Sequence, residues 1–294
     1  MSLFVRFWGV RGSIPTPGHH TARYGGNTPC VEVRVGEHRF ICDGGTGIRG
    51  LGSTLMSGGD GSPVNVHLLF SHAHWDHIQG FPFFAPAYVP STRVTVYGPR
   101  EGDTRMYRLL NGQMGSDYFP VQFADLGGHI EPGHLGDGRR TIAGVEVAAL
   151  PVNHPGGCFA FSFQWEGRKV VYATDHELDL VLTNATRVRD DRSVLRQAPR
   201  DLVDFCKGAD LLICDGQYTE EEYPSHVGWG HSRATSATDL AIQADVKRLA
   251  LFHHDPMQSD AQVDAKVEAC RARADDLQGD TQVFAAREGV ELKV

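Results

Sequence analysis

The stretch His72-Ala73-His74-Trp75-Asp76-His77 sets three histidines and one aspartate within six residues, directly after the apolar run 64–70. That run predicts a buried strand. His72 and His74, two residues apart in extended chain, point to one side and can share a metal ion. Asp76 and His77, at the start of a turn or helix, can reach a second metal ion beside the first. The alternative is a polar surface turn whose histidines are unrelated to one another.

Four ligands cannot complete the coordination of two metal ions, so donors from distant parts of the chain are needed. The candidates each follow an apolar run that predicts a strand: His154 in PVNHPGG, Asp175 in VVYATDHE, and His253 or His254 in LALFHHDP. Loops at strand ends carry functional residues because a rigid scaffold holds them. Taken singly, each residue has a simpler explanation as a loop histidine or a turn aspartate. Together with the HxHxDH stretch they indicate metal ligands.

The composition narrows the class of protein. The chain has 294 residues, 41% hydrophobic and 22% charged, with a formal net charge of −8, so it can bury a core and lacks a general cationic surface for nucleic acid. Its 15 histidines are the unusual feature. The six cysteines form no CxxC pair, which indicates reduced thiols in a cytoplasmic protein. Neither a membrane-spanning run nor a targeting segment is apparent.

The pattern of apolar runs and turn signals predicts the elements. We expect a strand-rich first half, with strands over 3–10, 30–35, 39–42, 64–70, 93–97, 141–150, 158–165 and 169–174 and a short helix over 48–56. In the second half we expect helices over 199–207, 231–244 and 260–277 and strands over 210–215, 248–252 and 289–294. This order predicts an α/β protein with two layers of sheet covered by helices. Without a linker or a repeat, we expect one domain over residues 1–294.

The order of HxHxDH and then His, Asp and His at strand ends, preceded by DGGTG at 43–47, resembles the metallo-β-lactamase superfamily over nearly the whole chain. The resemblance implies a four-layer αββα sandwich with a two-metal site between the sheet edges. It implies that His72, His74 and His154 hold one metal ion, that Asp76, His77 and His253 hold the other, and that Asp175 bridges them. His253 is preferred to His254 because the family ends this strand in a Leu-Thr-His-type sequence.

The donor set separates relatives within that superfamily. The diiron, oxygen-reducing branch typically has Glu in place of His74, so redox chemistry is disfavoured. Many true β-lactamases have a Cys at the second metal, and this chain has none there. We therefore expect two divalent metal ions, zinc by preference, although Mn²⁺ and Fe²⁺ suit the same donors. Asp43 in the DGGTG turn is expected to support the loops near the metal ions.

Two stretches point to the reaction. Residues 214–219 (CDGQYT) and 228–235 (GWGHSRAT) are similar to the phosphodiesterase branch, which includes ribonuclease Z and bacterial cyclic-nucleotide phosphodiesterases. By that resemblance Asp215 orients His231, and His231 donates a proton to the leaving oxygen or holds the phosphate. A histidine at a helix N-terminus would also have free backbone N–H groups beside it for a phosphate. We expect His231, Asp215 and Asp76 to be catalytic; the alternative for residues 231–232 is a helix cap.

The substrate expectation follows from charge. The segment 177–200 carries both signs of charge and few glycines, unlike the basic arm with which ribonuclease Z grips tRNA. We expect a small, cyclic-nucleotide-like phosphodiester cleaved by a metal-bridging hydroxide, with no membrane association and no stable nucleic-acid complex; a homodimer is left open. The alternatives are an ester, lactone or thioester hydrolase on the same fold, and an idle metal-binding sensor. Arg11, Asn27 and Thr28 are candidates for substrate contact, with turn formation as the alternative. The segments 106–114 and 118–123 are candidates for a lid, in which Tyr118 and Phe119 would stack on a base, with exposed packing as the alternative.

Overall fold

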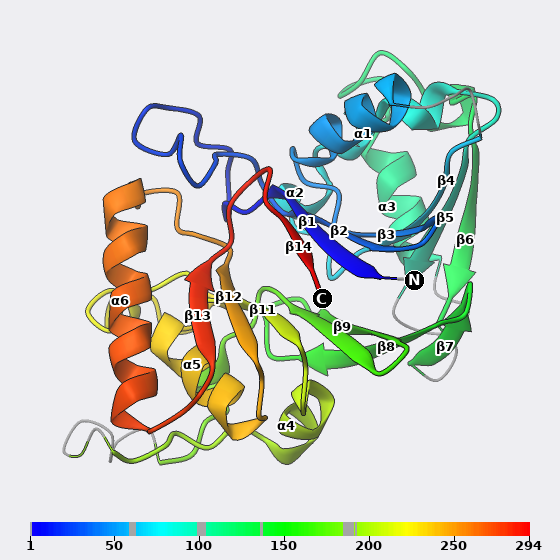
Figure 1. Cartoon of the computed structure of the whole chain (residues 1–294). Coiled ribbons are helices and arrows are strands. Elements are labelled where there is room, and N and C mark those ends of the chain that lie inside the picture. The colour runs from blue at the N-terminus through cyan, green and yellow to red at the C-terminus, as the bar shows by residue number, and fades with distance from the viewer. Residues whose placement is uncertain (1, 59–62, 99–103, 136–137, 185–190, 192) are drawn as a thin grey trace.

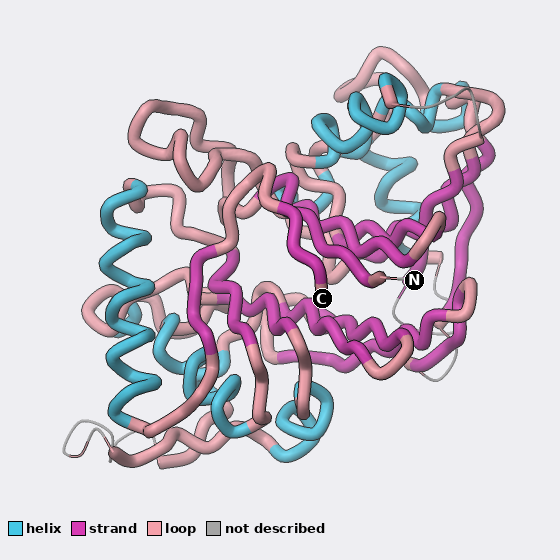
Figure 2. Tube along the Cα trace, in the orientation of Figure 1, coloured by secondary structure: helices cyan, strands magenta, loops and turns pink. Residues whose placement is uncertain are grey.

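Two seven-stranded sheets form the centre of the molecule in a computed structural model that describes residues 2–58, 63–98, 104–135, 138–184, 191 and 193–294 (Figures 1 and 2). The first sheet has the order β14-β1-β2-β3-β4-β5-β6. Its strands are β14 (Glu291–Lys293), β1 (Leu3–Gly9), β2 (Cys30–Val35), β3 (His38–Cys42), β4 (Asn65–Leu69), β5 (Arg93–Gly98) and β6 (His129–His134).

The second sheet has the order β13-β12-β11-β10-β9-β8-β7. Its strands are β13 (Gln282–Ala285), β12 (Arg248–Phe252), β11 (Leu211–Asp215), β10 (Arg168–Ala173), β9 (Cys158–Trp165), β8 (Val145–Val152) and β7 (Arg139–Ile142). Strands β10 to β13 pair in parallel. Because the carboxyl ends of parallel strands meet at one edge of a sheet, the residues that follow β10, β11 and β12 lie together.

Helices cover the outer face of each sheet (Figure 1). Helices α1 (Ile48–Ser57) and α3 (Arg105–Gln113) lie on the first sheet, and α4 (Arg200–Cys206), α5 (Ala234–Gln243) and α6 (Asp260–Asp276) lie on the second. The short helix α2 (Trp75–Ile78) follows β4. Apolar side chains of the facing sheets, Phe7, Phe40 and Phe163 among them, form the central core, and two further cores lie beneath the helices. The layers are those of the expected αββα sandwich.

Several element predictions need correction. The single strand expected over 141–150 is the hairpin of β7 and β8, which reverses at Ala143 and Gly144, both with positive φ (51° and 81°). Strands β6 and β13 were not predicted. β6 contains Pro132 and Gly133 and has little apolar alternation, and its place at a sheet edge is where proline is tolerated.

The helix expected from His231 begins three residues later, at Ala234. The segment 106–114, expected as a lid, is largely helix α3, which packs on β5. Within the described ranges, no helix has the length and apolar character needed to cross a membrane.

Candidate metal centre

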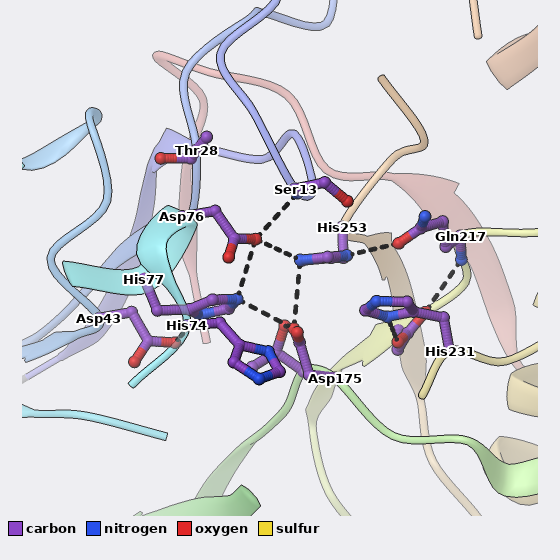
Figure 3. Close-up of polar contacts among 12 residues, drawn as sticks. Ser13, Thr28, Asp43, His74, Asp76, His77, Asp175, Gln217, His231 and His253 are labelled. Carbon is purple, nitrogen blue, oxygen red and sulfur yellow. Dashed lines mark hydrogen bonds and ion pairs between the residues drawn. The ribbon is translucent and has the colours of Figure 1, made fainter. Parts of the chain in front are cut away.

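The sequence-predicted ligands lie together on loops that follow β4, β8, β10 and β12. Figure 3 labels His74, Asp76, His77, Asp175 and His253 among them. Two sets of side chains, each with ligand atoms within 4.8 Å of one another, could each hold a metal ion. The first is His72, His74, His154 and Asp175, and the second is Asp76, His77, Asp175 and His253. We call these the first and the second set.

Asp175 belongs to both sets because its two carboxylate oxygens face different histidines. Oδ2 lies 3.4 Å from Nε2 of His72 and 3.8 Å from Nε2 of His154, in the first set. Oδ1 lies 3.2 Å from Nε2 of His77 and 3.2 Å from Nε2 of His253, in the second. Asp175 follows β10 with a positive φ of 32°, so the turn of the chain here directs the carboxylate between the sheets. The geometry is that of a carboxylate able to bridge two cations.

Asp76 completes the second set. Its Oδ2 lies 3.2 Å from Nε2 of His77 and 3.1 Å from Nε2 of His253, and it accepts a hydrogen bond from the backbone N–H of Ser13 at 2.8 Å (Figure 3). In the first set, Nε2 of His154 lies 3.1 Å from Nδ1 of His74. His74 is exposed, whereas the other members of both sets are buried. Solvent therefore reaches the first set at His74.

The histidines of the second set have their outer ring nitrogens fixed by hydrogen bonds. Nδ1 of His77 donates to Oδ2 of Asp43 at 2.8 Å, and Nδ1 of His253 donates to Oε1 of Gln217 at 2.8 Å. Such bonds select the tautomer whose Nε2 carries a free lone pair and turn that lone pair inward. In the first set His154 is held likewise, by donation from Nδ1 to the carbonyl oxygen of Gly230 at 2.8 Å.

The unpaired ring nitrogens of the buried histidines and the pKa values of the ligand side chains show whether the site suits a cation. Nε2 of His72 and Nε2 of His77 are buried without a hydrogen-bond partner, and both point at the carboxylates. Burial raises the pKa of the Asp175 carboxyl, but the surrounding histidines outweigh burial and hold that pKa well below its ordinary value. Burial lowers the pKa of His77, yet Asp175, Asp76 and Asp43 raise it well above the ordinary value. The carboxylates therefore favour positive charge around the second set, which a divalent cation on these donors would supply.

Asp43 anchors the second set from behind. Besides His77, it accepts hydrogen bonds from the hydroxyl of Tyr172 at 2.7 Å and from the backbone N–H and hydroxyl of Ser71 at 2.7 and 2.8 Å. The DGGTG turn was expected to support the loops near the ligands, and these contacts are present. Asp43 therefore fixes His77 and the segment that begins the HxHxDH stretch at the same time.

The two neighbouring histidines that follow β12, His253 and His254, have different surroundings. His253 has a left-handed φ of 58°, which turns its ring into the second set. Gly12 permits this approach, since a Cβ there would lie 2.4 Å from Nδ1 of His253. His254 points the other way: its ring is buried, and its Nε2 lies 3.0 Å from the carbonyl oxygen of Ala286. The residue preferred from the sequence is the one that joins the cluster.

Asp215 and His231 form a buried pair beside the second set. Asp215 ends β11 and accepts a hydrogen bond from Nδ1 of His231 at 2.7 Å. The His231 ring stacks on that of His253 with centroids 4.7 Å apart. Burial lowers the pKa of His231, but the charge of Asp215 outweighs it and raises the pKa to about 9. These two residues also form a third group of possible ligands with Asp175 and His253.

The expectation that His231 stands at a helix N-terminus is wrong. Helix α5 begins at Ala234, whose N–H donates to the carbonyl oxygen of Tyr218, while the N–H of Arg233 donates to Asp179. Ser232 is not a helix cap either, since its hydroxyl accepts from the N–H of Leu178. The N–H groups of Arg233 and Ala234 are therefore already engaged within the protein.

Residues of the opening glycine-rich segment hold loops together. The Arg11 side chain is buried and donates to the carbonyl oxygens of Gly25, Asp255 and Gln258. Asn27 pairs with Glu288. Thr28 Oγ1 accepts from the N–H of Thr46. For these three residues the structure shows the loop-forming alternative.

Of the aromatic candidates, the Tyr118 side chain is 78% exposed, and Phe119 packs edge-on against Phe83 at 5.4 Å. Neither lines the cavity beside His72 and His74. The base-stacking role expected for these two residues therefore finds no support in their positions.

Two supporting residues were missed. Gln217 lies in the quoted stretch 214–219 but had no assigned role, although it orients His253. Glu177 is buried and accepts from the N–H groups of Gly228 and Gly230 at 2.6 and 2.8 Å and from the Tyr223 hydroxyl at 2.8 Å. The only sequence signal for Glu177 is its place two residues after Asp175.

A family model described as "Beta-lactamase superfamily domain" matches residues 38–254, so the chain belongs to the β-lactamase superfamily. With these clusters, it is a metal-dependent hydrolase of the metallo-β-lactamase fold. It is 27% identical over 289 residues to a ribonuclease Z of Lachnospira eligens, covering 86% of this chain and 88% of that protein. The fold is similar to YhfI from Bacillus subtilis (TM-score 0.69, 17% identity, 99% of each chain covered). It is also similar to a diphosphatase of the PhnP family (TM-score 0.67, 16% identity, 99% and 98% covered).

Proposed function

We propose that this hydrolase is a phosphodiesterase that holds two divalent metal ions and cleaves a small, cyclic-nucleotide-like diester. The observation that carries the proposal is the buried Asp215–His231 pair, in hydrogen-bond contact at 2.7 Å and stacked on His253 beside two ligand sets that share Asp175. The relatives named ribonuclease Z and diphosphatase are consistent with cleavage at phosphorus.

In this proposal His72, His74 and His154 would hold one metal ion, Asp76, His77 and His253 would hold the other, and Asp175 would supply an oxygen to each. When bound, two such ions lower the pKa of a water molecule and neutralise charge on the phosphoryl oxygens of an in-line displacement. All the donors are imidazole or carboxylate, which suits zinc, and Mn²⁺ and Fe²⁺ suit the same set. Anomalous scattering from crystals at the three metal edges identifies the native ion.

His231 acts on the leaving oxygen. Because Nδ1 is bound to Asp215, the proton available for transfer is on Nε2, on the side of the ring away from β11. Asp215 keeps the ring in that orientation and compensates its positive charge. The ring therefore presents a proton beside the second set, from which His231 would reach the leaving oxygen of a bound diester.

A small substrate is favoured over a long RNA by charge and by the segment 177–200. The formal net charge of −8 repels polyanions in general, while a pair of divalent ions makes one site locally positive. The described parts of the segment pack on the molecule: Glu177 and Leu178 are buried at one end, and Arg196 and Ala198 at the other. Residues 185–190 and 192 lie outside the described residues.

A substrate panel tests the proposal. Metal-replete protein is assayed with bis-p-nitrophenyl phosphate and with 2′,3′- and 3′,5′-cyclic nucleotides, and in parallel with lactones, carboxyl esters and thioesters. We expect turnover of the diesters and little of the acyl substrates. Strong lactonase or thioesterase activity with silent diesters would establish the acyl-hydrolase alternative. Inertness across the whole panel would favour a metal-binding sensor.

A further inference from the structure

A cavity of about 270 Å³ lies against the first ligand set. Its inner wall is the segment Phe70–His74, which presents His72 and His74, and its rim includes the turn 155–157 that follows His154. The opposite wall is the first half of helix α3 with Met106 and Leu109. A molecule in this cavity therefore contacts two proposed metal ligands, His72 and His74, on one side and helix α3 on the other.

The wall opposite the ligands is largely apolar. Met106, Leu109 and Phe159 face the cavity together with the ring of Pro155, and Arg105 contributes a permanent positive charge. Gly156 and Gly157 both have positive φ, 82° and 85°, and a Cβ at Gly157 would meet nothing within 4 Å. Because Gly156 and Gly157 carry no side chain, this part of the cavity wall stays open beside the exposed His74.

We propose that this cavity is the subsite for the nucleoside part of the substrate, with the base lying between α3 and Phe159; this inference rests on the proposed phosphodiesterase function. Three features select this ligand class. The walls offer the ring of Phe159 and the flexible apolar side chains of Met106 and Leu109, contacts of the kind that bases use. The cavity opens directly onto His72 and His74, two of the proposed metal ligands. Its volume is below the roughly 300–1,000 Å³ of sites that enclose drug-sized ligands, so it takes one nucleoside and no second one.

A matched pair of substrates tests the inference. Thymidine 5′-(p-nitrophenyl phosphate) and methyl p-nitrophenyl phosphate have the same leaving group and the same diester and differ in the nucleoside. We expect the intact holoenzyme to prefer the thymidine ester at least tenfold in kcat/KM and to release thymidine 5′-phosphate. The variant Leu109→Trp fills the cavity from a partly buried position, so the preference is expected to fall at least fivefold. Arg108→Trp adds the same side chain on the same helix, outside the cavity lining, and is expected to keep it.

The outcomes separate this inference from the proposed function. If the wild-type enzyme cleaves both esters without preference, or if Leu109→Trp and Arg108→Trp have the same preference as the wild type, the subsite is wrong and the phosphodiesterase stands. If neither diester is cleaved while a lactone or thioester is, the proposed function itself fails. A folded Leu109→Trp protein is verified by its circular dichroism and its metal content.

Discussion

The Glu177 carboxylate accepts a hydrogen bond from the backbone N–H of Gly230 at 2.8 Å, and the carbonyl oxygen of this glycine accepts one from Nδ1 of His154 at 2.8 Å. One peptide segment thus connects a buried acid to a proposed metal ligand. The next residue along the chain is His231, so the same contact also positions the proposed proton donor.

Changing Glu177→Gln tests this link. Glutamine keeps one carbonyl oxygen for two backbone donors and turns an NH₂ group toward the other, so one of the bonds to Gly228 or Gly230 is lost. We expect kcat on bis-p-nitrophenyl phosphate to fall roughly 10- to 100-fold and the first set to release metal at a lower chelator concentration. Glu291→Gln, at a surface pair with Arg34, is the control. Unchanged kcat and unchanged metal retention in the Glu177 variant would show that the loop needs no such anchor.

Replacing His231→Ala separates a proton donor from a metal ligand. If His231 acts on the leaving oxygen, kcat falls about 10²- to 10⁴-fold while both metal ions are retained. If it is instead a ligand of the third group with Asp175 and His253, metal is lost. Mass spectrometric metal analysis and steady-state kinetics on the same sample distinguish the two. His226→Ala, in the same loop but outside the groups of potential ligands among the described residues, should leave metal content at the wild-type level.

Most of the centre could be predicted from the sequence because its ligands are either local or mark strand ends. His72, His74, Asp76 and His77 form one short stretch, and the pattern alone brings them together. His154, Asp175 and His253 are distant in sequence, but each follows an apolar run, and strands of one sheet end at the same edge. The αββα layering follows from the same runs.

The remaining features depend on contacts that leave no local pattern. Choosing His253 over His254 requires the positive φ at His253 and the space left by Gly12, both tertiary properties. Glu177 contacts a loop 51 and 53 residues away. The start of helix α5 was predicted too early because the 231–233 stretch pairs with Tyr218 instead of continuing the helix.

Asp175→Ala is expected to reduce the metal content below two ions per chain. Asp175 supplies an oxygen to each set, so its loss removes a donor and a negative charge from both. The measurement is metal stoichiometry after dialysis, together with anomalous difference maps from crystals of the variant. Asp210→Ala, at the residue immediately before β11 and paired with Lys247, is the matched control. Two ions retained in Asp175→Ala would contradict a bridging role.

The buried Lys266 gives the stability of the protein a pH dependence of its own. Its ammonium group donates to the carbonyl oxygen of Gln217 at 3.0 Å and to Gln258 Oε1 at 2.8 Å, and burial lowers its pKa from 10.5 to about 8. Between these two pH values the unfolded chain binds more protons than the folded one, so the free energy of unfolding rises with pH through this window. Below pH 8 both states are protonated, and the cost of burying the charge, roughly 3 kcal/mol, is fully present.

In Lys266→Met this pH-dependent contribution is absent. Urea unfolding of both proteins at several values from pH 7 to 10 should therefore give a wild-type stability that gains on the variant as pH rises. Parallel curves would mean that Lys266 keeps an ordinary pKa in the folded protein.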